Sequence, residues 1–296
     1  MSHFRQNLIC FGRIYSSKTR SLADLSCAGF PIVSTLCFGA HEWPGEKQLR
    51  AAALWPEQLP LYVRICFDAV EYPHSFYQIS KWDELQQTVR ILSAQAFEVT
   101  RKPCDITIQP LLLERFGGAV AALGDMLIIE AVDGNARGLL REGQFSDRAI
   151  LCGSRLIAEI SGEQRNALFW SGNGYRHRTM NQITWQDIRV LSAFPYNPST
   201  LYEFCVTQTG EPLFLEAKKL PKNTFFFEDN GVFTVYSSKG IQARQSFPLP
   251  SLSLRGQLKR NQLHIFNGGA YLSHLSVFAA AKQIPMCFAQ RIQQNE

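Results

Sequence analysis

Five short apolar runs follow one another between residues 106 and 160, and they constrain the fold more than any other feature of the sequence. The runs read ITIQPLLL, GAVAAL, MLIIEAV, RAILCG and RLIAEI. Apolar runs of this length, bounded by polar residues and glycines, are typical of strands. In the first hundred residues, apolar runs such as LPLYVRICF alternate instead with helical patterns such as DELQQTVRILSAQAF. This order predicts an α+β protein with a strand-rich middle.

A change of composition after the last predicted hairpin marks the candidate domain boundary. A helix is predicted around TWQDIRVLSAF, followed by a hairpin over LYEFCVTQTGEPLFLEA that turns at Thr209 and Gly210. The stretch KKLPKNTFFFEDNG then favours a boundary near residue 222, with domains 1–222 and 223–296. The second domain is small for an independent core, so we expect it to pack on the larger one.

Composition indicates a globular chain. The 296 residues are 46% hydrophobic, which is ample for a buried core. No window approaches the roughly 18 to 20 consecutive apolar residues of a membrane span, and the opening MSHFRQNLICFGR lacks a signal-peptide core. We therefore expect a soluble, cytoplasmic protein without a membrane partner. Its net charge of +5 suits an anionic ligand such as a nucleotide.

The cysteines and the basic stretches indicate no further class of site. The eight cysteines occur singly, with no CxxC pair and no histidine at zinc spacing, so most are expected to be small reduced core residues. Nucleic-acid binding through KKLPK and LRGQLKR is the least favoured function, because these stretches lack clustered aromatic residues or a known motif.

One histidine stands immediately before an Ala-rich apolar run, in NGGAYLSHLSVFAAAKQIPMC at residues 267–287. Glycines and a serine precede His274, and the run after it predicts a helix, so a turn presents this side chain at a helix N-terminus. The plainer interpretation is a capping or packing residue. A nucleophilic histidine would need a group that phosphorylates it, and the rest of the chain bears on that choice.

The stretch GAYLSHLSVFAAAKQIPMCF resembles the phosphohistidine motif of the family that includes phosphoenolpyruvate synthase, pyruvate phosphate dikinase and rifampin phosphotransferase. The family motif reads G-[GA]-x-x-S-H, followed by a helix and G-I-P-A. The resemblance places His274 on the phosphorylated histidine and Ser273 on its neighbour, with Gln283 where the family has glycine. It implies a two-lobed ATP-grasp nucleotide-binding fold followed by a small α/β swivelling phosphohistidine domain.

Two N-terminal stretches resemble the phosphate-binding motifs of the same family. SSKTRSLADLSCAGFPIVSTLCF places Lys18 on the phosphate-binding lysine, a mobile point cation, although a solvated lysine at a loop edge is the plainer interpretation. LPLYVRICFDAVEYPHSFYQI places Arg64 on the arginine that contacts ATP phosphates, for which its planar fork is suited. The chain departs from the family pattern at two pairs of positions: Ser16 and Ser17 stand where the family has glycines, and Ile65 and Cys66 stand where it has serines.

Two stretches in the middle of the chain resemble further nucleotide-contacting motifs. CDITIQPLLLERFGGAVAAL places Gln109 near the adenine edge of a bound nucleotide. MLIIEAVDGNARGLLREGQFSD matches the first acid of the family's V-V-I-E-A with Glu130, while Ala136 or Arg137 stands at the second acid. Without the resemblance, Glu130 would be interpreted as a strand-end acid that faces water.

The predicted hairpin resembles the metal-binding motif of the family. Glu203 falls on the metal-binding glutamate, and Glu216 replaces a glutamine. Two carboxylates on paired strands can share a magnesium ion, although both could simply be exposed hairpin residues. Leu201 and Lys218 replace the family's aspartate and arginine.

The resemblance implies a specific reaction. ATP binds between two lobes, with Lys18 and Arg64 on its phosphates and Mg²⁺ held by Glu203 and Glu216. His274 attacks the β-phosphate and carries a phosphoryl group to an acceptor, a small molecule or a separate protein, and AMP and phosphate are released. We expect no counterpart of the family's usual acceptor domain within these residues. The alternative is a degenerate relative that binds nucleotide or a partner without turnover, which the departures from the family motifs favour.

Overall fold

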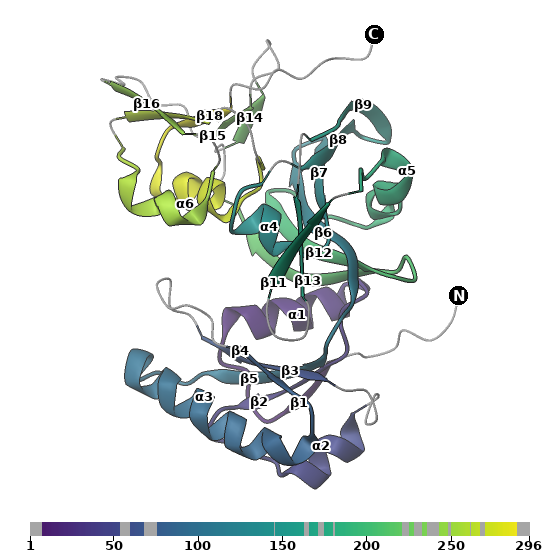
Figure 1. Ribbon diagram of the computed structural model, residues 1–296, viewed down its shortest axis with the longest axis vertical. Helices are drawn as coiled ribbons and strands as arrows, with labels where there is room; N and C mark the ends of the chain where they lie inside the picture. The colour runs from purple at the N-terminus through teal and green to yellow at the C-terminus, as the bar shows by residue number, and fades with distance from the viewer. Residues whose placement is uncertain are drawn as a thin grey trace. The chain divides into compact units, whose positions relative to one another are not determined.

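The computed structural model divides the chain into two compact units (Figure 1). It describes residues 8–53, 60–67, 76–144, 146–162, 166–170, 175–179, 181–220, 225–227, 233–235, 243–247, 250–260, 262–266 and 270–288. The first unit comprises Met1–Leu112 with Leu213–Ala217, and the second comprises Leu113–Pro212 with Lys218–Glu296. The mixed α and β architecture is confirmed. The domain boundary expected near residue 222 lies outside the described residues and stays a prediction.

The first unit is built on a five-stranded sheet in the order β1-β2-β5-β3-β4. Its strands are β1 (Leu8–Phe11), β2 (Thr35–Gly39), β3 (Leu61–Cys66), β4 (Phe76–Ile79) and β5 (Asp105–Pro110), and its helices are α1 (Ser17–Cys27), α2 (Glu46–Ala52), η1 (Trp82–Glu84) and α3 (Leu85–Thr100). In Figure 1, α1 lies on one face of this sheet and α2 and α3 on the other. Buried α3 residues recur at helical spacing, Leu85, Val89, Leu92 and Ala96, and pack in one core with the strands.

The second unit contains a six-stranded sheet in the order β13-β12-β6-β7-β8-β9. Its strands are β6 (Glu114–Leu123), β7 (Met126–Asp133), β8 (Asp147–Cys152), β9 (Arg155–Ile160), β12 (Thr200–Thr207) and β13 (Pro212–Lys219), of which Leu213–Ala217 group with the first unit. The pair β10 (Asn166–Trp170) and β11 (Tyr175–Thr179) is separate, and the short helices are α4 (Arg137–Leu140), α5 (Trp185–Ile188) and η2 (Arg189–Ala193). The five apolar runs therefore form strands, as predicted.

A second, smaller sheet in this unit contains the C-terminal strands, in the order β14-β15-β18-β17-β16. The elements are β14 (Phe225–Phe227), β15 (Phe233–Val235), β16 (Ala243–Phe247), η3 (Leu252–Gln257), β17 (Gln262–Phe266), α6 (His274–Lys282) and β18 (Met286–Phe288). Strands β17 and β18 are parallel, and α6 is the crossover between them. Residues of α6 and of the turn before it share one hydrophobic core with the six-stranded sheet, including Tyr271, Leu272 and Leu275 with Ala119 and Ile128. Among the described residues, the C-terminal part therefore shares its core with the six-stranded sheet.

Two cysteines differ from the reduced core residues expected for most of them. Cys10 and Cys37 lie opposite each other on β1 and β2 and form a disulfide. Six cysteines are free, among which Cys66, Cys104 and Cys205 are buried. Among the helices that the structure describes, none is long and apolar enough to cross a membrane.

Helix α6 is followed by a position whose backbone conformation favours glycine. Gln283 caps the helix in the left-handed conformation, with a φ of 56°, and its N–H donates to the carbonyl of Ala280. Glycine adopts this conformation without steric cost, which explains why the related motif has glycine at this position.

We expect Gln283→Gly to raise the free energy of unfolding by about 0.5–1 kcal/mol, because the relief of left-handed strain exceeds the added entropy of the unfolded chain. Urea unfolding curves measure the difference. Gln283→Ala is the control and should not stabilise the protein. A glycine variant less stable than the parent would contradict the strain argument.

Candidate functional site

A buried aspartate fixes the loop that leads into α1, the helix that carries Lys18. Asp105, at the start of β5, accepts hydrogen bonds from the backbone N–H of Tyr15 at 2.9 Å and of Ser16 at 2.8 Å, and from the Ser16 hydroxyl at 2.8 Å. Ser16 also caps α1, since its Oγ accepts from the backbone N–H of Thr19. Both Asp105 and Ser16 are 1% exposed. The serine that replaces a family glycine here therefore sets where α1 begins.

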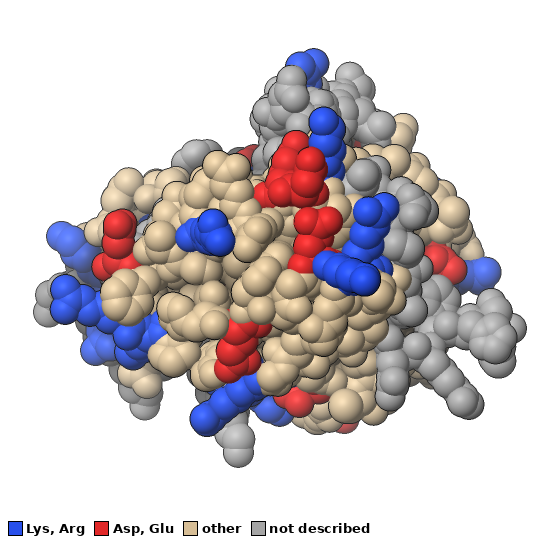
Figure 2. All heavy atoms as spheres, turned by 90° about the horizontal axis from the view of Figure 1, so that it is seen from below, with Lys and Arg blue, Asp and Glu red and all other residues tan. Residues whose placement is uncertain are grey.

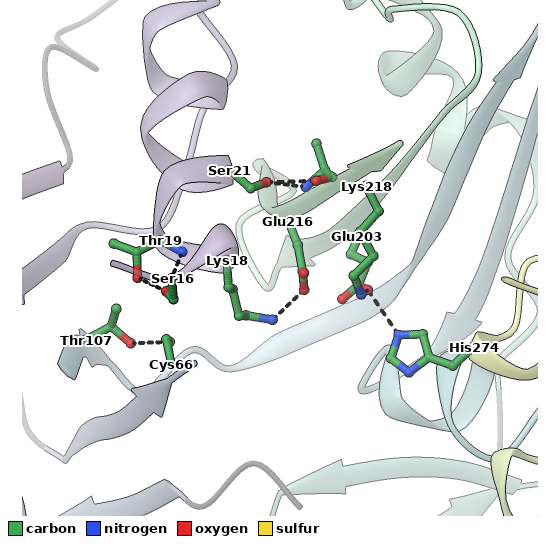
Figure 3. A network of polar contacts seen from close by, with 11 residues as sticks. Ser16, Lys18, Thr19, Ser21, Cys66, Thr107, Glu203, Glu216, Lys218 and His274 are labelled. Carbon is green, nitrogen blue, oxygen red and sulfur yellow. Dashed lines mark hydrogen bonds and ion pairs between the residues drawn. The ribbon is translucent and has the colours of Figure 1, made fainter. Parts of the chain in front are cut away.

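Lys18 is held in a partly buried ion pair. Its Nζ lies 2.5 Å from Glu216 Oε2, with the two side chains 19% and 11% exposed. The neighbouring Ser21 hydroxyl donates to the carbonyl of Ala217 and accepts from its N–H, so α1 is also bound to β13 through backbone groups (Figure 3). Lys18 is thus not the solvated loop lysine of the plainer interpretation, nor is Glu216 an exposed hairpin residue.

Arg64 and Cys66 lie on β3 in the same unit. Arg64 stacks over the ring of Tyr62, with 5.2 Å from its guanidinium carbon to the ring centroid. Burial acts to lower the pKa of Arg64, but the neighbouring Tyr62 and Cys66 outweigh it and raise the pKa, so the side chain is charged. Burial also raises the pKa of Cys66, whose sulfur lies 3.7 Å from the Thr107 hydroxyl. The cysteine is therefore a neutral, weak donor where the related motif has serine.

Gln109 lies on β5, where it is paired with Tyr62 of β3. Its side-chain amide donates to the Thr35 hydroxyl at 2.8 Å. This contact orients the amide within the first unit, and the adenine contact expected for it remains a prediction.

In the second unit, the structure brings His274 and Glu203 together. The Nε2 atom of His274 lies 3.0 Å from Glu203 Oε1, and Lys218 Nζ lies 2.5 Å from the same oxygen (Figure 3). Glu203 is 6% exposed, so it too is not an exposed hairpin residue. His274, the first residue of α6, keeps 26% of its side chain exposed. A histidine that is both oriented by a carboxylate and reachable from solvent is suited to nucleophilic chemistry.

The start of α6 adds a favourable field for an anion. Ser273 caps the helix, and its Oγ accepts from the backbone N–H of Ser276 at 3.3 Å. A helix N-terminus carries a partial positive charge, so a phosphoryl group on the first helical residue would be stabilised there.

Glu130 does not face water. Its side chain is fully buried and accepts hydrogen bonds from four groups: Ser146 Oγ at 3.1 Å, Arg148 Nε at 2.7 Å, and the backbone N–H of Tyr271 at 2.9 Å and of Leu272 at 2.7 Å. With these donors and no exposed surface, the carboxylate is not available to a nucleotide in this arrangement. The structure gives Glu130 a different position from the predicted nucleotide contact, directly under the turn that leads to His274.

The two acids that the resemblance assigns to magnesium are Glu203 and Glu216. Within the described ranges, no group of three or more His, Cys, Asp or Glu side chains gathers closely enough to hold a metal. Glu203 and Glu216 are each paired with a lysine. Magnesium in nucleotide sites is held by one or two carboxylates together with substrate phosphates, so single carboxylates of this kind suit it.

Neither a protein-family model nor a curated protein sequence matches the chain. Structural similarity was found to macrocyclase MdnC from Microcystis aeruginosa bound with precursor peptide MdnA, at 12% identity and a TM-score of 0.33, over 68% of this chain and 51% of that one. D-alanyl-alanine synthetase A from Vibrio cholerae aligns at 10% identity and a TM-score of 0.38, over 68% of this chain and 54% of that one. ATP-grasp ligase PsnB aligns at 16% identity and a TM-score of 0.33, over 68% and 51%.

The chain spans about half the length of these solved structures. TM-scores below 0.5 do not establish a shared fold. The geometry of the two residue clusters is therefore the basis for a functional assignment.

We expect Asp105→Asn to lower the free energy of unfolding by about 1–3 kcal/mol, because the amide places N–H donors against backbone N–H groups that need an acceptor. Chemical denaturation measures the change. Asp24→Asn, an exposed acid on α1, is the matched control and should shift stability by less than about 0.5 kcal/mol. Equal effects of the two substitutions would show that Asp105 does not anchor the loop.

Proposed function

We propose that this protein is an ATP-dependent phosphotransferase of the ATP-grasp type, in which His274 carries a phosphoryl group from ATP to an acceptor. The observation that supports the proposal most strongly is the 3.0 Å contact between His274 Nε2 and Glu203 Oε1. The motif resemblance had assigned these two residues to one reaction although they lie 71 positions apart in the sequence. The similarity to ATP-grasp structures has TM-scores below 0.5 and does not carry the proposal.

The hydrogen bond to Glu203 determines how His274 would react. A carboxylate can only accept, so neutral His274 donates through Nε2 and keeps its lone pair on Nδ1. In the proposed step, Nδ1 forms a bond to the β-phosphorus of ATP, the bond from that phosphorus to the α-bridging oxygen breaks, and AMP leaves with the electron pair. Water then splits the pyrophosphoryl group and releases phosphate. Glu203 offsets the positive charge that develops on the ring.

The resemblance also assigns two cations of the first unit to the phosphates of an ATP molecule. In the proposal, Lys18 and Arg64 neutralise its phosphate oxygens, Lys18 as a mobile ammonium and Arg64 as a planar fork. Gln109 would contact the adenine edge. Magnesium carried by the nucleotide would be held by Glu203 and Glu216 and would neutralise further phosphate charge.

The acceptor in this proposal is a small molecule or a separate protein, and nucleic acid is not expected. On the face drawn in Figure 2, acidic and basic side chains are interspersed and separated by uncharged surface. Surfaces that bind nucleic acid typically carry clustered basic residues, whereas this face carries charges of both signs.

Catalytic degeneration is the second candidate function, and specific contacts favour it. Both candidate magnesium ligands are already paired with lysines, and a buried neutral cysteine stands where the related motif has a serine hydroxyl. A protein of this kind would bind nucleotide, or a partner, without transferring phosphate.

Labelled ATP separates the two functions. With Mg²⁺ and ATP labelled at the β-phosphate, we expect acid-labile label on the protein and release of AMP, because the β-phosphorus stays on His274. ATP labelled at the γ-phosphate should release its label as free phosphate. EDTA should abolish labelling, and added Mg²⁺ should restore it. Quantification of label and of AMP measures both outcomes.

His274→Asn should reduce the label to background, whereas His41→Asn, which changes an exposed histidine outside the site, should not. Label that survives in His274→Asn would contradict the carrier role. Absence of label in the parent protein, with ATP binding retained in a calorimetric titration, would decide for the degenerate relative.

A further inference from the structure

Three consecutive backbone N–H groups hold the turn before His274 against the rest of the second unit. The Ala270 N–H donates to the carbonyl of Gly143 at 3.2 Å. The N–H groups of Tyr271 and Leu272 donate to the two oxygens of Glu130, at 2.9 Å and 2.7 Å. A turn bound at every one of three successive residues has little freedom, and His274 follows only two residues later.

Buried partners hold the Glu130 carboxylate itself. Arg148 Nε donates to it at 2.7 Å and Ser146 Oγ at 3.1 Å, and both residues are almost fully buried. The Arg148 guanidinium lies over the Tyr271 ring, 3.4 Å from the ring centroid. A residue of the turn therefore covers the ion pair between Arg148 and Glu130. Burial raises the pKa of Tyr271 despite the nearby arginine, and the ring stays neutral. The buried charge pair and the turn therefore depend on each other.

Strand register explains why the hydrogen bonds between Glu130 and the turn place His274 near Glu203. In the six-stranded sheet, Glu203 is paired with Ala119, Ala119 with Glu130, and Glu130 with Arg148. Directly opposed residues point to the same face of a sheet. The two glutamates are therefore two strands apart, about 10 Å, on one face.

A small residue leaves room for the turn on that face. Ala119 lies between the two glutamates in the row, and it belongs to the same buried core as Tyr271 and Leu272. The backbone from Leu272 to His274 can reach up to about 7 Å, and the side chains bridge the remainder of the distance between the glutamates.

We propose that Glu130, held by Arg148, is a positioning residue. It fixes the turn at Ala270–Leu272 and thereby keeps His274 in contact with Glu203. This positioning determines how His274 and the phosphoryl acceptor meet. Releasing the turn would leave a buried ion pair without two of its donors and would open the shared core, both of which are unfavourable. A histidine held in this way receives and delivers its phosphoryl group where it lies, so the acceptor comes to it, in place of the swivelling motion that the resemblance implied. The catalytic part of this inference rests on the proposed function, whereas the seating of the turn does not.

Hydrogen exchange and chemical modification test the positioning role without any turnover. We expect Glu130→Gln to speed exchange of the Tyr271 and Leu272 amides about tenfold relative to amides of β6 and β7, since a charged acceptor is lost. Diethyl pyrocarbonate should modify His274 several-fold faster in this variant, with the exposed His41 as internal reference in the same mass spectra.

Asp147→Asn is the matched control, because Asp147 is a buried acid on β8 that binds the backbone N–H groups of Gly162 and Ile183 and not the turn. It should change neither readout. If Glu130→Gln does not fold, Arg148→Lys carries the same test, since it keeps the charge but loses the Nε contact. Exchange that rises equally throughout the second unit, or unchanged reactivity of His274, would overturn the proposal.

Phosphorylation kinetics add a third readout. Where the parent protein is labelled by ATP, Glu130→Gln should lower the rate constant for His274 labelling about tenfold and leave the KM for ATP unchanged. An increase in KM alone would contradict positioning. If the parent protein is not labelled, the phosphotransferase assignment fails, and the exchange and modification experiments still decide whether Glu130 seats the turn.

Discussion

A buried carboxylate, Glu130, is the interaction on which the candidate site depends. It is fully buried, and its oxygens accept from an arginine, a serine and two backbone N–H groups of the turn before α6. A buried charge is tolerated only when it is paired and hydrogen-bonded, and here the turn provides part of that compensation. The second unit therefore cannot keep Glu130 satisfied and also release the turn that carries His274.

The first unit uses the same arrangement around Lys18. Asp105, on β5, is a buried acid that accepts hydrogen bonds from backbone N–H groups just before a helix, as Glu130 does from β7. A serine caps each helix, Ser16 before α1 and Ser273 before α6. The residue that carries the proposed chemistry then lies in the first turn of its helix. In both units, a strand acid, a serine cap and a helix N-terminus together orient one basic side chain.

Local pattern and motif resemblance predicted part of this structure. Apolar runs predicted the strands of the middle of the chain, periodicity predicted α3, and the Thr209–Gly210 turn predicted the β12–β13 hairpin, because each depends on neighbouring residues. The resemblance assigned His274 and Glu203 to one reaction, as phosphoryl carrier and as magnesium ligand, whereas their direct contact was found only in the structure.

Long-range partners account for what the sequence did not reveal. Asp105 binds Tyr15 and Ser16 across about 90 positions, and Glu130 binds the turn across 141 and 142 positions. No local pattern separates a buried anchoring acid from a nucleotide ligand, so Asp105 was missed and Glu130 was assigned to the nucleotide. The contacts of Lys218 and Arg148 with carboxylates could be found only from strand register.

The most direct measurement of the central claim is the scalar coupling between the amide nitrogens of Tyr271 and Leu272 and the side-chain carboxyl carbon of Glu130, across the hydrogen bonds to its two oxygens. It is observable by long-range triple-resonance NMR on deuterated protein. The structure predicts a cross-peak from each amide to that carboxyl carbon, and the loss of at least one of the two in Glu130→Gln, whose side-chain amide has a single acceptor oxygen. Two rapidly exchanging amides with no such coupling in the parent protein would contradict the account.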